Sequence, residues 1–139
     1  RLRATTRDRG VRLLIGLDAD LARAVGADGV HLPERALDQA GALAMDRPDW
    51  ILTGAAHSRQ VLETPGLDAF VVSPVFPAGG TSADRPAVGL QTLGDWVEAA
   101  PCPVYALGGI DSGNALSLVR SGACGIAGVS AIRSAVGWQ

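Results

Sequence analysis

The stretch that decides the fold is residues 104–132, V-Y-A-L-G-G-I-D-S-G-N-A-L-S-L-V-R-S-G-A-C-G-I-A-G-V-S-A-I. Val104–Leu107 and Gly125–Val129 are apolar runs of strand length, and the segment between them is long enough for a helix. A glycine pair, Gly108–Gly109, ends the first run, and Ser130 follows the second. This order predicts a parallel β-α-β unit, whose two strands end on the same side of a sheet.

The helix between these strands has predicted ends and a predicted buried face. Asp111 or Ser112 is expected to cap its start, because either side chain accepts amide hydrogens of the first turn. Gly122 is expected to end it, since glycine adopts the left-handed backbone of a helix C-cap. Apolar positions at helical spacing predict a stripe that packs on the sheet: Ala115, Leu116, Leu118 and Val119.

The two glycine-marked strand ends also predict an anion site. The amide hydrogens of Gly109, Val129 and Ser130, with Gly108 beside them, would converge at the carboxyl ends of the two strands. Amide hydrogens and helix N-termini attract anions, and the loops after the last two strands of (β/α)8 barrels often bind phosphate. The alternative is that the glycines only permit tight turns and close packing. The residues alone leave both interpretations open.

The rest of the chain repeats the strand–helix pattern. Apolar runs predict strands over Val11–Ile15, Gly29–Leu32, Trp50–Ala55 and Ala69–Ser73, with helical segments between them, among them Arg35–Met45. Six strands alternating with helices predict an α/β fold with a parallel sheet. We expect one domain over residues 1–139, a (β/α)8 TIM barrel of which this chain covers about six βα units, the N-terminal units being absent.

A short internal repeat marks the starts of three predicted strands. Gly26-Ala27-Asp28-Gly29-Val30 is similar to Gly122-Ala123-Cys124-Gly125-Ile126, and Pro65–Phe70 is a weaker third copy. Each copy joins the end of a helix to the start of a strand. We interpret the repeat as a packing motif at the N-terminal ends of the strands, the side of a barrel that contributes to stability.

Composition narrows the classes of partner and compartment. The net charge is −2, from 12 basic and 14 acidic residues, which argues against a nucleic-acid surface. No apolar run reaches membrane-spanning length. Cys102 and Cys124 have neither metal-ligand spacing nor a disulfide framework, as is typical of a reducing cytosol. We therefore expect a cytoplasmic protein that binds neither nucleic acid nor membrane.

Six motifs, taken in order, resemble the thiamine-phosphate synthase and TenI-type family. They are A-V-G-A-D-G-V-H-L at 24–32, H-S at 57–58, V-S-P-V-F-P at 72–77, G-L-Q-T-L at 89–93, A-L-G-G-I at 106–110 and G-V-S-A-I at 128–132. The resemblance implies a (β/α)8 barrel of thiamine biosynthesis that forms a homodimer. Synthases of the family join a pyrimidine diphosphate to a thiazole phosphate with the help of Mg²⁺, whereas TenI-type tautomerases aromatise the thiazole phosphate. In both, the thiazole phosphate binds amides carried here by Gly109, Val129 and Ser130.

The chain departs from both catalytic patterns of that family. The two metal-binding aspartates of the synthases are replaced within Gly16-Leu17-Asp18 and Pro33-Glu34-Arg35-Ala36, unless Asp18 or Glu34 substitutes for them. The lysine expected after Pro77 is absent, and Arg85 is the nearest cation. Pro74 stands where a tautomerase carries histidine. The resemblance thus implies no tightly bound cofactor and no assignable metal ligands, and it leaves Mg²⁺ binding open.

Candidate site residues follow the predicted strands. His57 and Glu34 are the candidates for acid–base catalysis, because imidazole and carboxyl groups transfer protons near neutral pH. The alternatives are a helix-capping role for His57 and an ordinary surface carboxylate for Glu34. Further substrate-site candidates are His31, Ser58, Ser73 and Arg85. A histidine bonded to backbone is the alternative for His31, and a solvated loop charge for Arg85.

Three functions remain open at this point. The first is a thiamine-pathway protein that binds thiazole phosphate. It would either condense this ligand with the pyrimidine diphosphate or tautomerise it, and the sequence leaves open whether it catalyses either reaction. The second is a non-catalytic, regulatory barrel that binds a phosphate ester. The third is a phosphate-sugar-type isomerase on the same fold, for which the glycine motifs alone would suffice. All three share a small phosphate ester as the ligand.

Overall fold

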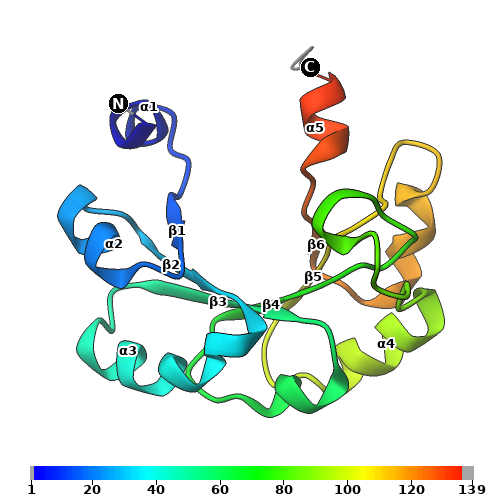
Figure 1. The fold of residues 1–139 in the computed structure, drawn as a ribbon, viewed down its shortest axis with the longest axis horizontal. Coiled ribbons are helices and arrows are strands. Elements are labelled where there is room, and N and C mark those ends of the chain that lie inside the picture. Colours follow the sequence, from blue (N-terminus) through cyan, green and yellow to red (C-terminus); the bar gives the residue numbers. More distant parts are fainter. Residues whose placement is uncertain (1, 136–139) are drawn as a thin grey trace. The chain divides into compact units, whose positions relative to one another are not determined.

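The computed structural model describes residues 2–135, which form two compact units whose elements are drawn in Figure 1. Unit 1 consists of the residues up to 55 together with 64–69, and unit 2 consists of residues 56–63 and those from 70 onward. Strand order follows the sequence, β1-β2-β3 and then β4-β5-β6, and each described strand pair is parallel. Helices alternate with the strands, so the predicted parallel α/β class is confirmed.

Unit 1 packs short helices against three strands. Its elements are α1 (Leu2–Asp8), β1 (Leu14–Gly16), α2 (Ala19–Val25), β2 (Gly29–Leu32), η1 (Glu34–Gln39), α3 (Ala40–Asp46) and β3 (Ile51–Ala56). Its core consists of fully or nearly fully buried aliphatic side chains: Ala22, Val30, Leu32, Leu37, Ala40 and Leu52. Alternate residues of β2 enter this core, as expected for a strand with its two faces in different surroundings.

Three predicted elements of unit 1 have different bounds in the structure, among them the third strand, which covers Ile51–Ala56 rather than Trp50–Ala55. The first strand begins at Leu14 rather than Val11, whose side chain is exposed. The helix predicted over Arg35–Met45 is divided into the 3₁₀ helix η1 and the α-helix α3. By contrast, β2 has the predicted bounds, Gly29–Leu32.

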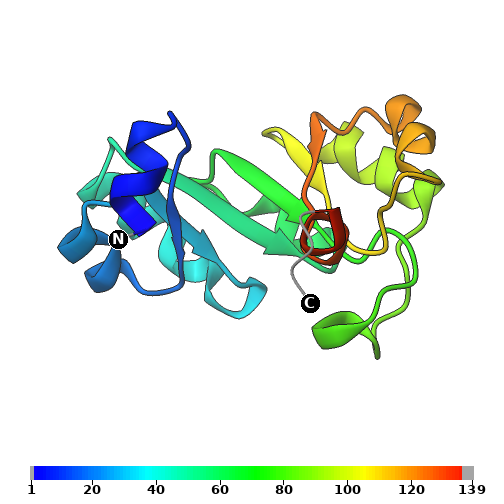
Figure 2. The same cartoon turned by 90° about the horizontal axis from the view of Figure 1, so that it is seen from above.

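Unit 2 contains the loops that follow β3, β4, β5 and β6. Its elements are η2 (Arg59–Glu63), β4 (Ala69–Val72), η3 (Gly80–Ser82), α4 (Leu90–Ala99), β5 (Val104–Ala106), η4 (Ala115–Ser121), β6 (Gly125–Ile126) and α5 (Ser130–Ala135). Its core includes Phe70, Val72, Val75, Leu93, Val104, Ala106 and Leu118. Figure 2 shows the loop after β4, which carries η3, extending away from α4 and η4.

The helix predicted between the two strands of residues 104–132 is the 3₁₀ helix η4. The buried face that we predicted for it is therefore wrong. Leu118 and Ser121 of η4 are buried, whereas Leu116 and Val119 are exposed. A 3₁₀ helix has three residues per turn, so positions three apart share a face and the stripe predicted from α-helical spacing does not form. The predicted left-handed cap at Gly122 is confirmed, with φ 76°. The second strand is shorter than predicted, because β6 ends at Ile126 and leaves Val129 beyond it.

Within residues 2–135, no helix combines the length and the apolar character needed to cross a membrane.

Candidate functional site

Three of the predicted site residues come together in unit 2 around the imidazole of His57, which directly follows β3. Nδ1 of His57 lies 2.7 Å from the backbone oxygen of Ser73 and 3.3 Å from the Ser73 hydroxyl. Nε2 of the same ring lies 2.6 Å from Nη1 of Arg85. The structure therefore joins a strand end, a second strand end and a distant loop in one polar cluster.

The two partners of His57 differ in how firmly the chain holds them. Ser73 is buried, and its amide donates to the oxygen of Ala56 at 3.1 Å. Arg85 is exposed on the loop between β4 and α4. The end of that loop is tied back, because Val88 and Gly89 donate to the backbone oxygens of residues 74 and 75 at 2.8 and 3.0 Å. Arg85 thus has an exposed side chain on a loop whose end is hydrogen-bonded to the segment after β4.

The Gly108–Gly109 turn after β5 packs tightly against the segment that follows β4. The two glycines have φ of 96° and 65°, in the left-handed region. A Cβ atom at Gly108 would lie 2.7 Å from Cα of Pro74, and one at Gly109 would lie 2.5 Å from the oxygen of Pro77. Close packing therefore requires glycine at both positions, whatever ligand the turn binds.

The hydrogen bonds of this turn orient its amides. The amide of Val75 donates to the oxygen of Leu107 at 2.9 Å, and the amide of Phe76 donates to the oxygen of Gly108 at 3.1 Å. In a planar trans peptide the N–H points opposite to the C=O. The N–H groups of Gly108 and Gly109 therefore point away from the Val75–Phe76 segment. The other edge of β5 is the one that pairs with β6.

Val129 and Ser130 lie at the turn between β6 and α5. The amide of Ala127 still donates to the oxygen of Ala106 at 2.8 Å, so the pairing of β5 and β6 continues to this point. Helix α5 begins at Ser130, and the oxygen of Val129 accepts from the amide of Arg133 at 3.0 Å. The glycine turn and the start of α5 thus follow neighbouring parallel strands, as the sequence predicted.

Asn114 is a structural residue of this region that the sequence analysis did not single out. Its Nδ2 donates to the oxygen of Gly109 at 2.7 Å, and its Oδ1 accepts from the amide of Asp111 at 2.9 Å. Oδ1 of Asp111 in turn accepts from the amide of Gly113 at 2.8 Å. This bond closes the turn before η4, whose N-cap is Asn114 and has no side-chain cap, so the predicted capping of the helix by Asp111 is wrong. The spacing D-x-x-N after the glycine pair is the signal, because Asp and Asn side chains close such turns.

The remaining candidates have separate surroundings. In unit 1, Nδ1 of His31 lies 2.9 Å from the hydroxyl of Thr53, a side chain of the neighbouring strand β3. Glu34 is half-buried at the start of η1. Ser58, in unit 2, is half-buried beside His57.

The positions that correspond to the metal ligands of the synthases lie in unit 1. Leu17 and Ala36 carry no oxygen ligand, and Ala36 is buried. The carboxylate of Asp18 caps α2 by accepting from the amide of Leu21 at 2.8 Å. Within residues 2–135, no three His, Cys, Asp or Glu side chains are grouped closely enough to hold a metal ion.

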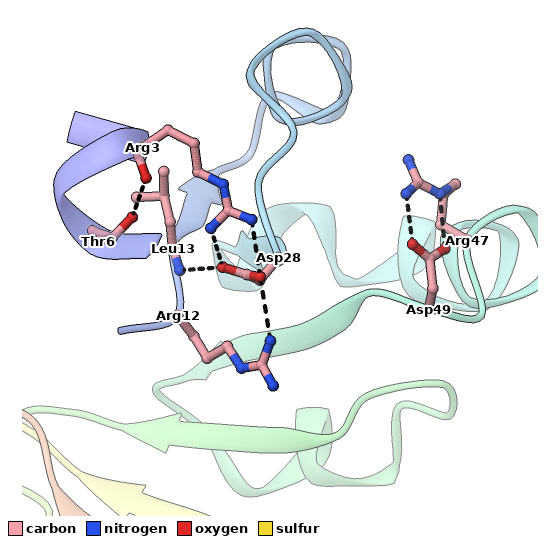
Figure 3. Close-up of polar contacts among 7 residues, drawn as sticks. All are labelled: Arg3, Thr6, Arg12, Leu13, Asp28, Arg47 and Asp49. Atoms are coloured by element: carbon pink, nitrogen blue, oxygen red, sulfur yellow. Dashed lines mark hydrogen bonds and ion pairs between the residues drawn. The ribbon is translucent and has the colours of Figure 1, made fainter. Parts of the chain in front are cut away.

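A second polar cluster, in unit 1, centres on Asp28 (Figure 3). Its carboxylate accepts from the amide of Leu13 at 2.8 Å and from Arg3 at 2.6 and 3.2 Å, with Arg12 at 3.4 Å. The hydrogen bond from the Leu13 amide, followed by those from Arg3, lowers the pKa of Asp28 to about 2. This cluster ties α1 and the start of β1 to the turn before β2.

Comparison with known proteins gives consistent matches. The family model described as thiamine monophosphate synthase matches residues 1–132. A thiamine-phosphate synthase of Haloquadratum walsbyi is 36% identical over 141 residues, covering 96% of this chain and 62% of that protein. One of Archaeoglobus fulgidus is 35% identical over 138 residues, covering 97% and 64%. This chain thus spans less than two thirds of the length of either protein.

The structure itself resembles a solved relative. A thiamine phosphate pyrophosphorylase from Pyrococcus furiosus superposes with a TM-score of 0.75 at 29% identity, over 96% of this chain and 68% of that one. Together with the parallel strands, this similarity confirms the predicted fold class, α/β of the barrel type, for the part that the chain covers.

Proposed function

The chain belongs to the thiamine monophosphate synthase family, and we propose that its unit 2 binds a thiazole phosphate. The phosphate would lie at the carboxyl ends of β5 and β6, against the amides of Gly108, Gly109, Val129 and Ser130. His57 would serve as the acid–base group near that ligand, with Ser73 and Arg85 beside it. In the whole protein, this binding would serve thiamine biosynthesis in the cytoplasm.

The observation that carries the proposal is the orientation of the glycine peptides. The amides of Val75 and Phe76 donate to the carbonyl oxygens of residues 107 and 108. The amides of Gly108 and Gly109 therefore point away from the Val75–Phe76 segment. Backbone amides that point toward one another can bind an anion although they carry no formal charge themselves. The start of α5 adds its partial positive charge. The family supplies the ligand class, and this turn supplies donors of the right kind.

Calorimetric titration with hydroxyethylthiazole phosphate tests the binding. The matched variants are Ser130→Pro and Ser130→Ala. Proline is well tolerated at the first position of a helix, so S130P removes one proposed donor while α5 is retained, and S130A keeps the amide. Loss of one hydrogen bond to a charged group should weaken binding roughly tenfold or more in S130P, with little change in S130A. Equal affinity for the phosphate and its alcohol precursor would contradict the site.

We further propose that Mg²⁺-dependent coupling is weak or absent in this chain. Leu17 and Ala36 lack the oxygen ligands that hold the metal-bound diphosphate in the synthase pattern. Lost electrostatic stabilisation of this kind typically lowers a rate by about a hundredfold or more. The assay is thiamine phosphate formation from both precursors, with and without a chelator. Rapid turnover that the chelator abolishes would show that other residues replace those ligands.

A further inference from the structure

The sheet face of unit 1 that lies opposite the buried core carries a row of glycine, histidine and threonine. Strand register places Gly16 of β1, His31 of β2 and Thr53 of β3 level with one another. Side chains alternate along a strand, and the neighbours of His31, Val30 and Leu32, are fully buried in the core. His31 therefore faces away from that core, together with Thr53, whose hydroxyl its ring contacts.

The row is open above Gly16. A Cβ atom at this glycine would meet no described atom of unit 1 within 4 Å. Gly16 does not have a positive φ, so its conformation does not demand glycine. A glycine inside a strand often marks a place where a ligand approaches the backbone closely. Gly16 thus leaves space on the sheet surface, level with the half-buried His31 side chain.

Leu17 borders this space at the carboxyl end of β1, and its backbone is strained. Its φ is 65°, a left-handed value that bulky residues rarely adopt. Two hydrogen bonds hold it there. The Leu17 amide donates to the oxygen of His31 at 2.9 Å, and the amide of Asp18 donates to the oxygen of Gly16 at 2.7 Å. Strained residues held in this way cluster at binding sites, and the Leu17 side chain is 38% exposed.

The surroundings of this leucine favour an uncharged ligand group. The carboxylate of Asp18 is engaged at the start of α2, where it accepts from the amide of Leu21 at 2.8 Å. Two residues beyond the row, β2 and β3 continue with Pro33 and Ala55, which are apolar and half-buried. An aliphatic side chain does not compensate a charged group for lost hydration, whereas it stabilises an apolar ring.

We propose that unit 1 binds an uncharged, planar ring over Gly16, with the side chain of Leu17 against the ring. The carboxyl ends of the strands are the side on which barrel proteins bind their ligands. Leu17 is then a specificity-determining residue, which selects a ring without charge over a charged group. The proposal concerns unit 1 and is separate from the phosphate contacts proposed for unit 2.

A pair of probes that share one ring tests the selectivity. Hydroxymethylpyrimidine is an uncharged planar alcohol, and its diphosphate ester adds a strongly charged group. In a nitrogen-15 NMR titration of the chain, the alcohol should shift the amide resonances of Gly16 and Leu17. The diphosphate should bind there no more tightly, with or without Mg²⁺. Unshifted Gly16 and Leu17 resonances, or a diphosphate that binds there about tenfold more tightly than the alcohol, would overturn the proposal. Shifts confined to unit 2 would also contradict it, while leaving the phosphate site in place.

Substitution of Leu17 tests its role. Leu17→Asp places a charge against the ring, and aspartate tolerates a left-handed backbone. The affinity for the alcohol should fall about tenfold or more, because the apolar contact is lost. Leu21→Asp is the matched control, since it makes the same change at an exposed position of α2 and should leave the affinity unchanged. Equal affinities in L17D and L21D would refute the role of Leu17.

Filling the open space tests the position of the ring. Gly16→Val adds a side chain where unit 1 leaves room for one, so the fold should be retained while binding of the alcohol is abolished. Circular dichroism and urea denaturation check that the variant is folded. A folded G16V that binds hydroxymethylpyrimidine as the wild type does would show that the ring does not lie over Gly16.

Discussion

The turn before β2 in unit 1 and the turn after β5 in unit 2 are held together by different forces. Asp28 holds the first through side-chain charge, with Arg3, Arg12 and the Leu13 amide around one carboxylate. Backbone hydrogen bonds and close packing hold the second, at Gly108–Gly109. A carboxylate surrounded by its own donors has little capacity left for a ligand. A turn held through its carbonyl oxygens leaves its amides directed outward.

The arginines of the two units, Arg3 and Arg85, differ in the same way. Arg3 lies partly buried against Asp28, and its side chain is 21% exposed. Arg85 is exposed and contacts the His57 ring. An arginine already paired with a carboxylate gains little from another anion, whereas Arg85 gains a charged partner. Among the described residues, Arg3 thus forms an ion pair with a carboxylate, whereas no carboxylate ion pair is formed by Arg85.

The largest expected effect comes from breaking the backbone-held turn. Gly109→Val should lower the free energy of unfolding by about 4 kcal/mol, because it adds left-handed strain to overpacking against Pro77. Urea denaturation measures it. Gly128→Ala is the control, since a Cβ there would meet only the flexible side chain of Ile132, at 3.2 Å. A fully stable G109V would mean that packing does not hold this turn.

An intermediate effect is expected from the 3₁₀ helix that follows the same turn. Leu118→Ala should cost about 3 kcal/mol, because Leu118 is 4% exposed and its removal leaves a cavity. Leu116→Ala should change stability by less than about 0.5 kcal/mol, because that side chain is 83% exposed. The same denaturation series compares the pair. Equal losses of stability in the two variants would instead support the α-helical apolar face predicted from the sequence.

The effect expected at the charge-held turn depends on pH. The pKa of Asp28 is lowered from 3.8 to about 2, so its stabilisation is complete above pH 3.8 and is lost as pH falls through about 2. Asp28→Asn should therefore flatten the stability curve in this window, measured by thermal unfolding. Arg3→Ala should flatten it only in part, because the Leu13 amide remains a donor. An unchanged acid profile in D28N would assign the sensitivity to other groups.

The repeat at the strand starts was predictable from sequence, and the structure gives its chemistry. Asp28 and Asp68 each donate their amide to the oxygen of a residue, Leu13 or Leu52, and accept that residue's amide on their carboxylate. In the remaining copy, Cys124 stands where the others have aspartate. Its amide donates to the oxygen of Val104 at 2.9 Å, and its thiol donates to the same oxygen at 3.2 Å. The packing interpretation agrees with these bonds, which short sequence copies reproduce because they are local.

The sequence by itself determined the parallel α/β class, the order of the strands and the family, since hydrophobic period, glycine and proline positions and ordered motifs act over a few residues. Tertiary structure alone decided that η4 is a 3₁₀ helix that buries Leu118 instead of Leu116. It also decided the direction of the Gly109 amide and the contact of Arg85 with His57. Each of these depends on contacts between residues far apart in the chain, which local spacing does not encode.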